Sequence, residues 1–463
     1  MRLWLLPLTG LAIAGAPGPA ADPPTRPNVL VILSDDQSAA HVGCYGNPDV
    51  RTPNLDAFAR TAVRFDRMYV TCPQCVPSRA SLMTGRSPVA IGMTRFSAPL
   101  PAECVTWPEV LRKAGYFTGV AGRTYHLDGA PNPELTPIYE RHKLRTFPDR
   151  LDFVKTAGDG DGSLRQLREF LDAVPAGKPF ALQLCFSDPH RPYTAPKVHD
   201  SKALTLPKHY PDTSAVRADY AAYLDEIARL DADFGRVLAE LDKRKVADNT
   251  LVLFLGDNGA AQWRGKGTLY EFGIRVPLLV RWPGVTKGVT VSGDLVSGED
   301  LAPTVLEACG QKPLKEMTGK SFAPLLRGDK FEGRKYVFAE RGAHGQGLPG
   351  TSSAFDLGRV VVSKTHKFVY NATFHLPYHG VDFGNTDMFK EVRELAKEKK
   401  LPDPLNALYD GRARLLFELF DLVNDPNEFV NLAGKPEASA IETELRAALV
   451  EWMVLERDFL PLP

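Results

Sequence analysis

The sequence contains little cysteine, no excess of charge of either sign and no hydrophobic run long enough to span a bilayer. Only 6 of its 463 residues are cysteine, and 56 basic residues balance 56 acidic ones. The zero net charge gives no electrostatic reason to bind nucleic acid, and no acidic tail suggests disorder. With 44% hydrophobic and 24% charged residues, the composition is that of a globular protein large enough for more than one domain.

An apolar stretch at the start of the sequence has the pattern of a secretory signal peptide. Arg2 precedes an apolar run from Leu3 to Ala14, and small residues continue to Ala21. The run is too short for a transmembrane segment, and no cysteine follows it to carry a lipid. We therefore expect residues 1–21 to be removed. The mature chain would be exported to a periplasm, to the cell exterior or, in a eukaryote, to a lysosome-type lumen.

Two of the six cysteines are spaced as a redox pair or half of a metal site would be. Cys72 and Cys75 form C-x-x-C, but no second pair completes a zinc site. A thioredoxin-like centre belongs to a much smaller βαβ domain, and Pro77 suggests a helix that starts only after Cys75. Cys185 and Cys309 lie in apolar stretches and are expected to be buried thiols.

Buried strands alternate with helices over the first two thirds of the chain. Four apolar runs end in the polar segments SDD, GRTYH, SDPH and GDNG, and helices are expected at 52–65 and 216–245. This alternation predicts an α/β domain with a large, mostly parallel sheet flanked by helices. Polar groups at the carboxyl ends of parallel strands collect at one edge of a sheet, so we expect the four segments to converge.

The pattern changes from about residue 330 onward. KYVFAE, GRVVVS, HKFVYN and LFELFDL read as short strands, and a helix is expected over 438–456. Residues 382–414 are polar and helix-rich and are interpreted as a long insertion. We therefore divide the chain into a larger domain at 22–330 and a smaller α+β subdomain at 331–463.

Four oxygen-bearing side chains follow two of the predicted strands. Asp35 and Asp36 end the first strand, and Asp257 and Asn258 end a later one. Each pair alone could be a helix cap or a turn. Together at one sheet edge they would form a single site, and oxygen-only ligands favour Ca²⁺ or Mg²⁺ over zinc.

The segment from Cys75 to Arg86, CVPSRASLMTGR, resembles the signature of the type I sulfatases. NVLVILSDD upstream, GDNG and GKGTLYEFGIRVPLLVRWPG downstream, and ELFDLVNDPNEFVNLAG near the end follow in family order. The resemblance implies an alkaline-phosphatase-like fold and one Ca²⁺ per chain. It also implies a maturation enzyme that recognises C-x-P-x-R and oxidises Cys75 to formylglycine.

That resemblance gives the residue types a chemical meaning. A hydrated formylglycine has two hydroxyls on one carbon: one attacks the sulfate ester, and the other can later lose its proton and expel sulfate. Ca²⁺ held by the four oxygen-bearing side chains would contact both this group at position 75 and the sulfate oxygens. Arg79 would hydrogen-bond the hydrated aldehyde.

Basic side chains carry over from the family one by one. Arg123 stands where the family usually has Lys, which keeps the charge but changes the donor geometry. His126 matches a family His, His190 matches the His near the leaving oxygen, and Lys266 matches the second sulfate-binding Lys. The implied catalytic set is Cys75, Arg79, Arg123, His126, His190 and Lys266.

Within the family the resemblance is greatest to sulfamidase-like members, through DPHRPY and the segment HKFVYNATFHLPYHGVDFGN. A sulfated carbohydrate is the implied substrate, with a heparan-type N-sulfate or a sugar O-sulfate as candidates, since GKGTLYE keeps the general sulfatase form. Arg341, His344 and His375 are expected to bind it near the mouth of the site, where His379 and Asp382 could also line the wall.

Two alternatives remain at this stage. One is a phosphodiester or phosphonate monoester hydrolase of the same superfamily, because some of these enzymes also use formylglycine. The other is a non-catalytic glycan-binding relative, which would be expected to lack Cys75, Arg79 or the ligand acids. All of these residues are present here.

Overall fold

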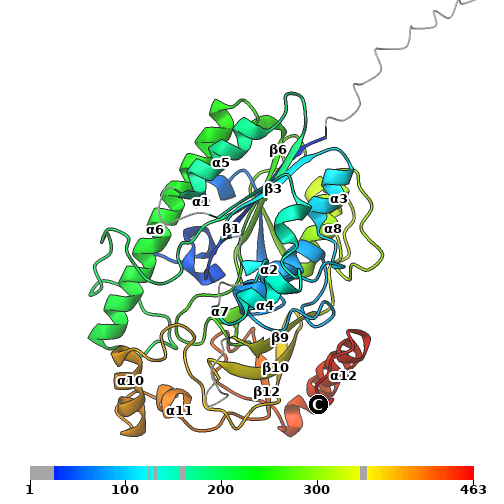
Figure 1. Cartoon of the computed structure of the whole chain (residues 1–463). Helices are drawn as coiled ribbons and strands as arrows, with labels where there is room; N and C mark the ends of the chain where they lie inside the picture. The colour runs from blue at the N-terminus through cyan, green and yellow to red at the C-terminus, as the bar shows by residue number, and fades with distance from the viewer. Residues whose placement is uncertain (1–25, 124–125, 130–132, 157–161, 345–351) are drawn as a thin grey trace, which may run out of the picture.

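The computed structural model describes residues 26–123, 126–129, 133–156, 162–344 and 352–463, so the predicted signal peptide lies outside the described residues. An eight-stranded sheet with the order β4-β3-β5-β1-β6-β7-β2-β8 forms the centre of the molecule (Figure 1). Neighbouring strands from β4 to β6 are parallel, and β7 is antiparallel to both β6 and β2. The strands are β1 Asn28–Ser34, β2 Val63–Tyr69, β3 Phe117–Gly122, β4 Phe153–Thr156, β5 Phe180–Cys185, β6 Thr250–Gly256, β7 Leu278–Arg281 and β8 Thr290–Ser297.

Helices cover both faces of this sheet, which explains why its central strands read as unbroken apolar runs. Every residue of β1, β5 and β6 is buried. Along β1 the side chains alternate between two cores: Leu30 and Ile32 face one, and Val29 and Leu33 face the other. The first core holds α1 Pro53–Ala59, α5 Gly162–Ala173 and α6 Ser214–Lys243; the second holds α2 Cys75–Thr84, α3 Trp107–Lys113 and α8 Leu301–Ala308 (Figure 1). The shorter α4 Thr136–Arg141, α7 Glu271–Ile274 and α9 Ala323–Arg327 lie in connections.

A second, antiparallel sheet with the order β12-β11-β10-β9 follows in the C-terminal part. One of its faces packs under α12, and side chains of the other face, such as Val360 and Phe420, join the apolar core of the large sheet. The predicted insertion carries two helices that pack beside the N-terminal half of α6 (Figure 1). The elements are β9 Val337–Ala343, β10 Phe355–Val362, β11 His366–Asn371, β12 Phe417–Asp421, α10 Asp387–Lys397, α11 Leu405–Tyr409 and α12 Ser439–Leu455.

Two local expectations were wrong. The helix predicted at 52–65 ends at Ala59, and the strand β2 begins at Val63, where buried and half-buried residues start to alternate. The helix expected after Cys75 begins at Cys75 itself, because Gln74 is the extended residue before it and Pro77 fits within the first helical turn. In the described part of the chain, no helix has the length and apolar character that a membrane span requires.

Candidate active site

The four polar segments converge as expected, because β3, β5, β1 and β6 are consecutive neighbours in the sheet. Their carboxyl ends deliver Arg123, His190, the pair at 35 and 36, and the pair at 257 and 258 to one edge. Parallel strands with helical crossovers place their carboxyl ends together, so residues far apart in the sequence meet here.

A left-handed residue lets two successive carboxylates serve the same cluster. Neighbouring side chains of a strand normally point to opposite faces, but Asp36 has φ +67° and turns the chain at the end of β1. Its N–H donates to Asp257 Oδ1 at 3.0 Å, and its carbonyl accepts from Tyr223 Oη at 2.9 Å. Asp35, Asp36, Asp257 and Asn258 are all fully buried.

Cys75 is the first residue of α2 and points into this group of carboxylates. Its Sγ lies 3.5 Å from Asp35 Oδ1 and 3.9 Å from Asp36 Oδ1. Burial, and then the charge of Asp35, raise the pKa of the Cys75 thiol well above its usual value. The thiol is therefore protonated at neutral pH, and an unmodified Cys75 would be a poor nucleophile. All six cysteines are free, so Cys72 and Cys75 form no disulfide, and both Cys185 and Cys309 are buried as expected.

Two arginines neutralise the buried carboxylates. Arg79 contacts Asp257 Oδ2 through Nε at 2.8 Å and Asp35 Oδ2 through a terminal nitrogen at 3.0 Å. Arg123 Nε lies 2.9 Å from the same oxygen of Asp35. Gly122, the residue before Arg123, lets the end of β3 lie close to the end of β5. It has φ +88°, and a Cβ there would lie 1.8 Å from the carbonyl oxygen of Cys185.

Lys266 connects the cluster to the C-terminal part of the chain. Its Nζ lies 2.9 Å from Asp36 Oδ1 and 2.7 Å from Asp382 Oδ2, and the side chain is almost fully buried. The next residue, Gly267, has φ +80° and donates its N–H to the carbonyl of Pro73 at 2.9 Å. The loop that carries Lys266 is thus fixed against the segment just before Cys75.

Two histidines stand on different sides of the cluster. His126 is buried, and one of its ring nitrogens lies within 4.8 Å of both Cys75 Sγ and an oxygen of Asp35. His190 is partly exposed, and its Nε2 lies 3.6 Å from Asp36 Oδ2 and 3.6 Å from Asp382 Oδ2. His190 can therefore reach an incoming substrate, whereas His126 faces the nucleophile position.

Burial and charge shift the ionisable groups of the site in opposite directions. Burial raises the pKa of Asp35, but Arg123 and Arg79 more than offset it, so the pKa lies well below its usual range. Burial, and then the charge of Asp35, raise the pKa of Asp257 to about 7. Burial, and then the charge of Arg79, hold the pKa of His126 well below its usual value. The Asp35 carboxylate is therefore ionised beside its two arginines, whereas the His126 imidazole is neutral at pH 7.

The three expected substrate-binding residues have different surroundings. His344 Nε2 lies 3.6 Å from Asp382 Oδ1, close to the cluster. Arg341 is buried, and it donates to the carbonyls of Gly267 and Ser353 at 2.9 and 3.0 Å, so its guanidinium fixes two loops instead of facing the mouth. His375 is exposed and has its ring contact with Phe374, not with a member of the cluster.

Asp382 is the residue whose importance the sequence did not reveal. It was expected only as part of the wall, yet it lies within 3.6 Å of Lys266, His190 and His344. Its signal in the sequence is weak, a single acid in HGVDFGN. Asp382 and His344 also line an open pocket of about 430 Å³ beside the cluster, together with His379.

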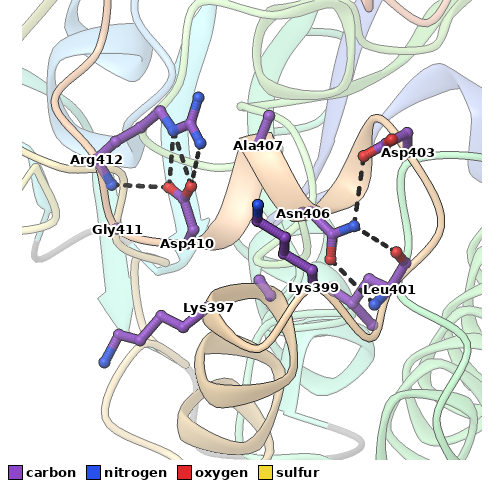
Figure 2. A pocket seen from close by; sticks show the side chains of 10 residues that line it. Lys397, Lys399, Leu401, Asp403, Asn406, Ala407, Asp410, Gly411 and Arg412 are labelled. Carbon is purple, nitrogen blue, oxygen red and sulfur yellow. Dashed lines mark hydrogen bonds and ion pairs between the residues drawn. The ribbon is translucent and has the colours of Figure 1, made fainter.

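A larger open pocket lies elsewhere, on the insertion. It measures about 850 Å³ and is lined by residues of α10, α11 and the loops around them (Figure 2). Several of its polar groups satisfy one another: Arg412 pairs with Asp410, and Asn406 bonds the backbone of Leu401 (Figure 2). None of the residues that line it belongs to the cluster, so size alone does not locate the active site.

Residues 27–311 match the sulfatase family, which is more than half of the chain. The chain is 33% identical to human arylsulfatase A over 71% of its length and 73% of that protein. It is 28% identical to an ulvan-active sulfatase of Formosa agariphila over 94% of its length and 81% of the relative, and 28% identical to human N-sulphoglucosamine sulphohydrolase over 92% and 89%.

Solved structures share the fold over nearly the whole chain. One was determined in complex with its substrate D-glucosamine-2-N,6-O-disulfate; it has a TM-score of 0.70 at 19% identity and covers 94% of this chain and 99% of its own. A phosphonate monoester hydrolase from Silicibacter pomeroyi also has a TM-score of 0.70, at 23% identity over 94% and 96%. These likenesses confirm the predicted fold class, an alkaline-phosphatase-like sheet with a smaller C-terminal sheet.

Proposed function

The chain belongs to the sulfatase family, and from that premise we propose that it removes sulfate from a sulfated carbohydrate with a formylglycine made from Cys75 and one bound Ca²⁺. Family membership makes it a sulfuric ester hydrolase. The observation that carries the rest is the position of Cys75, at the first turn of α2 and 3.5 Å from the carboxylate of Asp35.

The donor set fits calcium. Asp35, Asp36, Asp257 and Asn258 offer oxygen atoms, which Ca²⁺ prefers. Asn258 Nδ2 donates to Asp36 Oδ1 at 2.8 Å, which leaves Asn258 Oδ1 buried with no hydrogen-bond partner among the described residues. A buried orphaned oxygen is costly unless a ligand satisfies it. With Cys75 in its converted form, these residues would hold the ion, which supplies positive charge to the sulfate oxygens.

The side chain at position 75 needs conversion to act. Hydrated formylglycine supplies two hydroxyl groups on one carbon, of which one attacks sulfur and the other allows sulfate to leave afterwards. Arg79, held by two carboxylates, orients this group. Cys75 is buried in the folded protein, so a maturation enzyme must convert it before folding is complete. The CVPSR segment supports such a conversion during export.

The remaining side chains bind the sulfate and move protons. Arg123 and Lys266 provide positive charge from two sides of the cluster. His190 is open enough to donate a proton to the leaving oxygen or nitrogen of the sugar. His126 lies beside the nucleophile position, where it assists sulfate release by accepting a proton.

The sugar itself is proposed from the relatives. A glucosamine N-sulfate at the end of a chain is the first candidate and a sugar O-sulfate the second, because the relatives include both N-sulphoglucosamine sulphohydrolase and ulvan-active sulfatases. Exposure of His190 and Asp382 beside an open pocket supports a substrate that enters by one end. A phosphonate monoester is the alternative, favoured by the fold shared with such a hydrolase.

A substrate panel tests the proposal. Purified, matured enzyme is incubated with N-, 2-O- and 6-O-sulfated monosaccharides, heparin-derived disaccharides, an aryl sulfate and a phenylphosphonate ester, with Cys75→Ala as the blank. We expect sulfate release from at least one sugar with no release by the blank. Faster hydrolysis of the phosphonate than of every sulfate would favour the alternative, and release from internal positions of intact polymer alone would contradict the chain-end substrate.

A further inference from the structure

We propose that Asp382 selects the substrate: its carboxylate accepts a hydrogen bond from an uncharged hydroxyl or N–H next to the scissile sulfate and rejects a sugar that carries a second anion there. This inference rests on the proposed sulfatase function and narrows its substrate class to sugars with neutral donor groups around the sulfate that is removed.

Asp382 contacts Lys266, one of the sulfate-binding groups, and also lines the open pocket. Its Oδ2 contacts Lys266 Nζ at 2.7 Å and lies 3.6 Å from His190 Nε2, and its Oδ1 lies 3.6 Å from His344 Nε2. About a quarter of its side chain is exposed (27%), whereas Lys266 is almost fully covered. A sulfate that contacts Lys266 therefore lies beside the Asp382 carboxylate, within reach of the sugar that carries it.

Asp382 is the one carboxylate of this group that the metal proposal does not use. Its charge opposes the binding of an anion, since like charges a few ångströms apart repel each other in a partly exposed site. Lys266 offsets that charge for one sulfate group. The same lysine also contacts Asp36, so its single positive charge is already shared and does not offset a second anion.

No described lysine or arginine lines the open pocket beside Asp382, so the lining offers a second anion no such cation. Arg341 is the nearest candidate from the sequence, but its guanidinium donates to the carbonyls of Gly267 and Ser353. Burial lowers the pKa of His344, which is therefore neutral at pH 7. The described residues that line the pocket include Ser353, Asn385 and Thr386 but no lysine or arginine.

The pocket suits hydroxyl groups instead. Its described polar lining consists of hydroxyl, amide and imidazole groups around a single carboxylate. Its volume of about 430 Å³ falls within the range of about 300–1,000 Å³ that small-molecule sites occupy. A carboxylate accepts strongly from hydroxyl or N–H donors, so Asp382 gives such a sugar orientation as well as affinity.

The test compares two matched sugars in three proteins. The sugars are glucosamine N-sulfate and the same sugar with a second sulfate on the adjoining 3-oxygen, or the equivalent pair for whichever sugar the panel identifies. The proteins are the wild type, Asp382→Asn, and Asp387→Asn as a control. Asp387 lies in the same insertion but does not line the pocket; its side chain is 99% exposed and pairs with Lys390.

We expect the wild type and Asp387→Asn to prefer the monosulfated sugar by at least about tenfold in kcat/KM, because like charges brought into contact repel each other. Asp382→Asn should reduce that preference about tenfold or more. If Asp382 only positions Lys266, the variant will lower kcat/KM equally for both sugars and for an aryl sulfate, which would overturn the inference.

A binding measurement keeps the test decisive if Asp382→Asn turns over slowly. Calorimetry with Cys75→Ala and with Cys75→Ala/Asp382→Asn needs no catalysis. The first should bind the monosulfated sugar more tightly, and the second should lose that preference; equal preference in both refutes the role of Asp382. Wild type that releases sulfate from no sugar refutes the proposed function, whereas sulfate release without any preference refutes this inference alone.

Discussion

Arg79 holds together the groups on which the proposed chemistry depends. Its planar guanidinium contacts Asp35 and Asp257, and another of its nitrogens donates to the carbonyl of Arg123 at 3.0 Å. A lysine would offer its donors from a single nitrogen instead of from a planar fork. The four-residue spacing from Cys75 places Arg79 one helical turn along α2, on the same face.

His190 provides a prediction about the leaving group. In His190→Ala, turnover of sugar sulfates should fall at least about 100-fold, because the sugar oxygen or nitrogen leaves poorly without a proton. An aryl sulfate, whose phenolate is a good leaving group, should lose less than about tenfold. The measurement is kcat/KM for both substrates across pH, and equal losses on the two would contradict the assignment.

Single residues could be predicted where a motif or a strand end marked them. Asp35 and Asp257 were found because each follows a buried strand with a readable pattern, and Cys75 because it opens the CVPSR motif. The role of Asp382 and the buried contacts of Arg341 could not be predicted, because both depend on how loops of the C-terminal part pack against the loop of Lys266. Such contacts between distant loops leave no periodicity in the sequence.

The ends of β1 and β6 form the proposed metal site, and Asp257 tests it. Wild type should contain one Ca²⁺ per chain by metal analysis. Asp257→Ala should contain none and should release no sulfate, while its circular dichroism stays close to that of the wild type. Asp294→Ala, an acid on β8 whose partner is the exposed Lys364, should keep the metal. Two zinc ions per chain, or full calcium in Asp257→Ala, would refute this site.

A buried ion cluster links the loop that carries Lys266 to the C-terminal sheet. Lys367 on β11 is fully buried and contacts Glu271 at 2.8 Å and Glu428 at 2.7 Å. Glu428 also accepts from the backbone N–H of Glu271 at 2.8 Å, and its carbonyl accepts from Arg264, two residues before Lys266. The family-like segments GKGTLYE, HKFVYN and DPNEFVNLAG meet in this cluster.

Loss of the central cation should be costly. Lys367→Met leaves two buried carboxylates without their lysine, so the free energy of unfolding should fall by about 3–5 kcal/mol. Lys364→Met, in the turn just before β11, removes a half-exposed lysine paired with Asp294 and should cost less than about 1 kcal/mol. Urea unfolding compares the two variants, and similar losses would show that the cluster does not stabilise the fold.

Elements were predicted well where one period dominated. The buried strands and the long helix α6 had clear patterns, whereas the sequence 52–65 kept a helix-like pattern through a turn into β2. The edge strand β4 was missed because it is short and only partly buried. Its pairing with β3 is a tertiary contact that local sequence does not encode.

At the scale of the whole molecule, the two sheets share one apolar core. Val337, Val360 and Phe420 of the C-terminal sheet pack in the same cluster as Val29 and Leu253 of the large one. The boundary proposed near residue 330 therefore separates two sheets but not two cores. The expected α+β character of the C-terminal part was visible in its short strands, whereas this shared core was not.

A shared core predicts cooperative unfolding. Tryptophan fluorescence and far-ultraviolet circular dichroism should report one coincident transition in urea, because neither sheet can lose its partner and keep its core buried. Trp107 and Trp263 sample the part of the chain before residue 330, and Trp452 samples α12. Two separated transitions would show that the C-terminal part folds on its own.

The central claim is that sulfate release depends on formylglycine at position 75. Preparations made with different amounts of maturation enzyme are digested, the fraction of converted Cys75 is measured by peptide mass spectrometry, and sulfate release from the best sugar is measured on the same samples. Turnover should rise in proportion to the converted fraction, extrapolate to zero at no conversion and be absent in Cys75→Ala. Full turnover from a preparation that retains the cysteine in every chain would contradict the account.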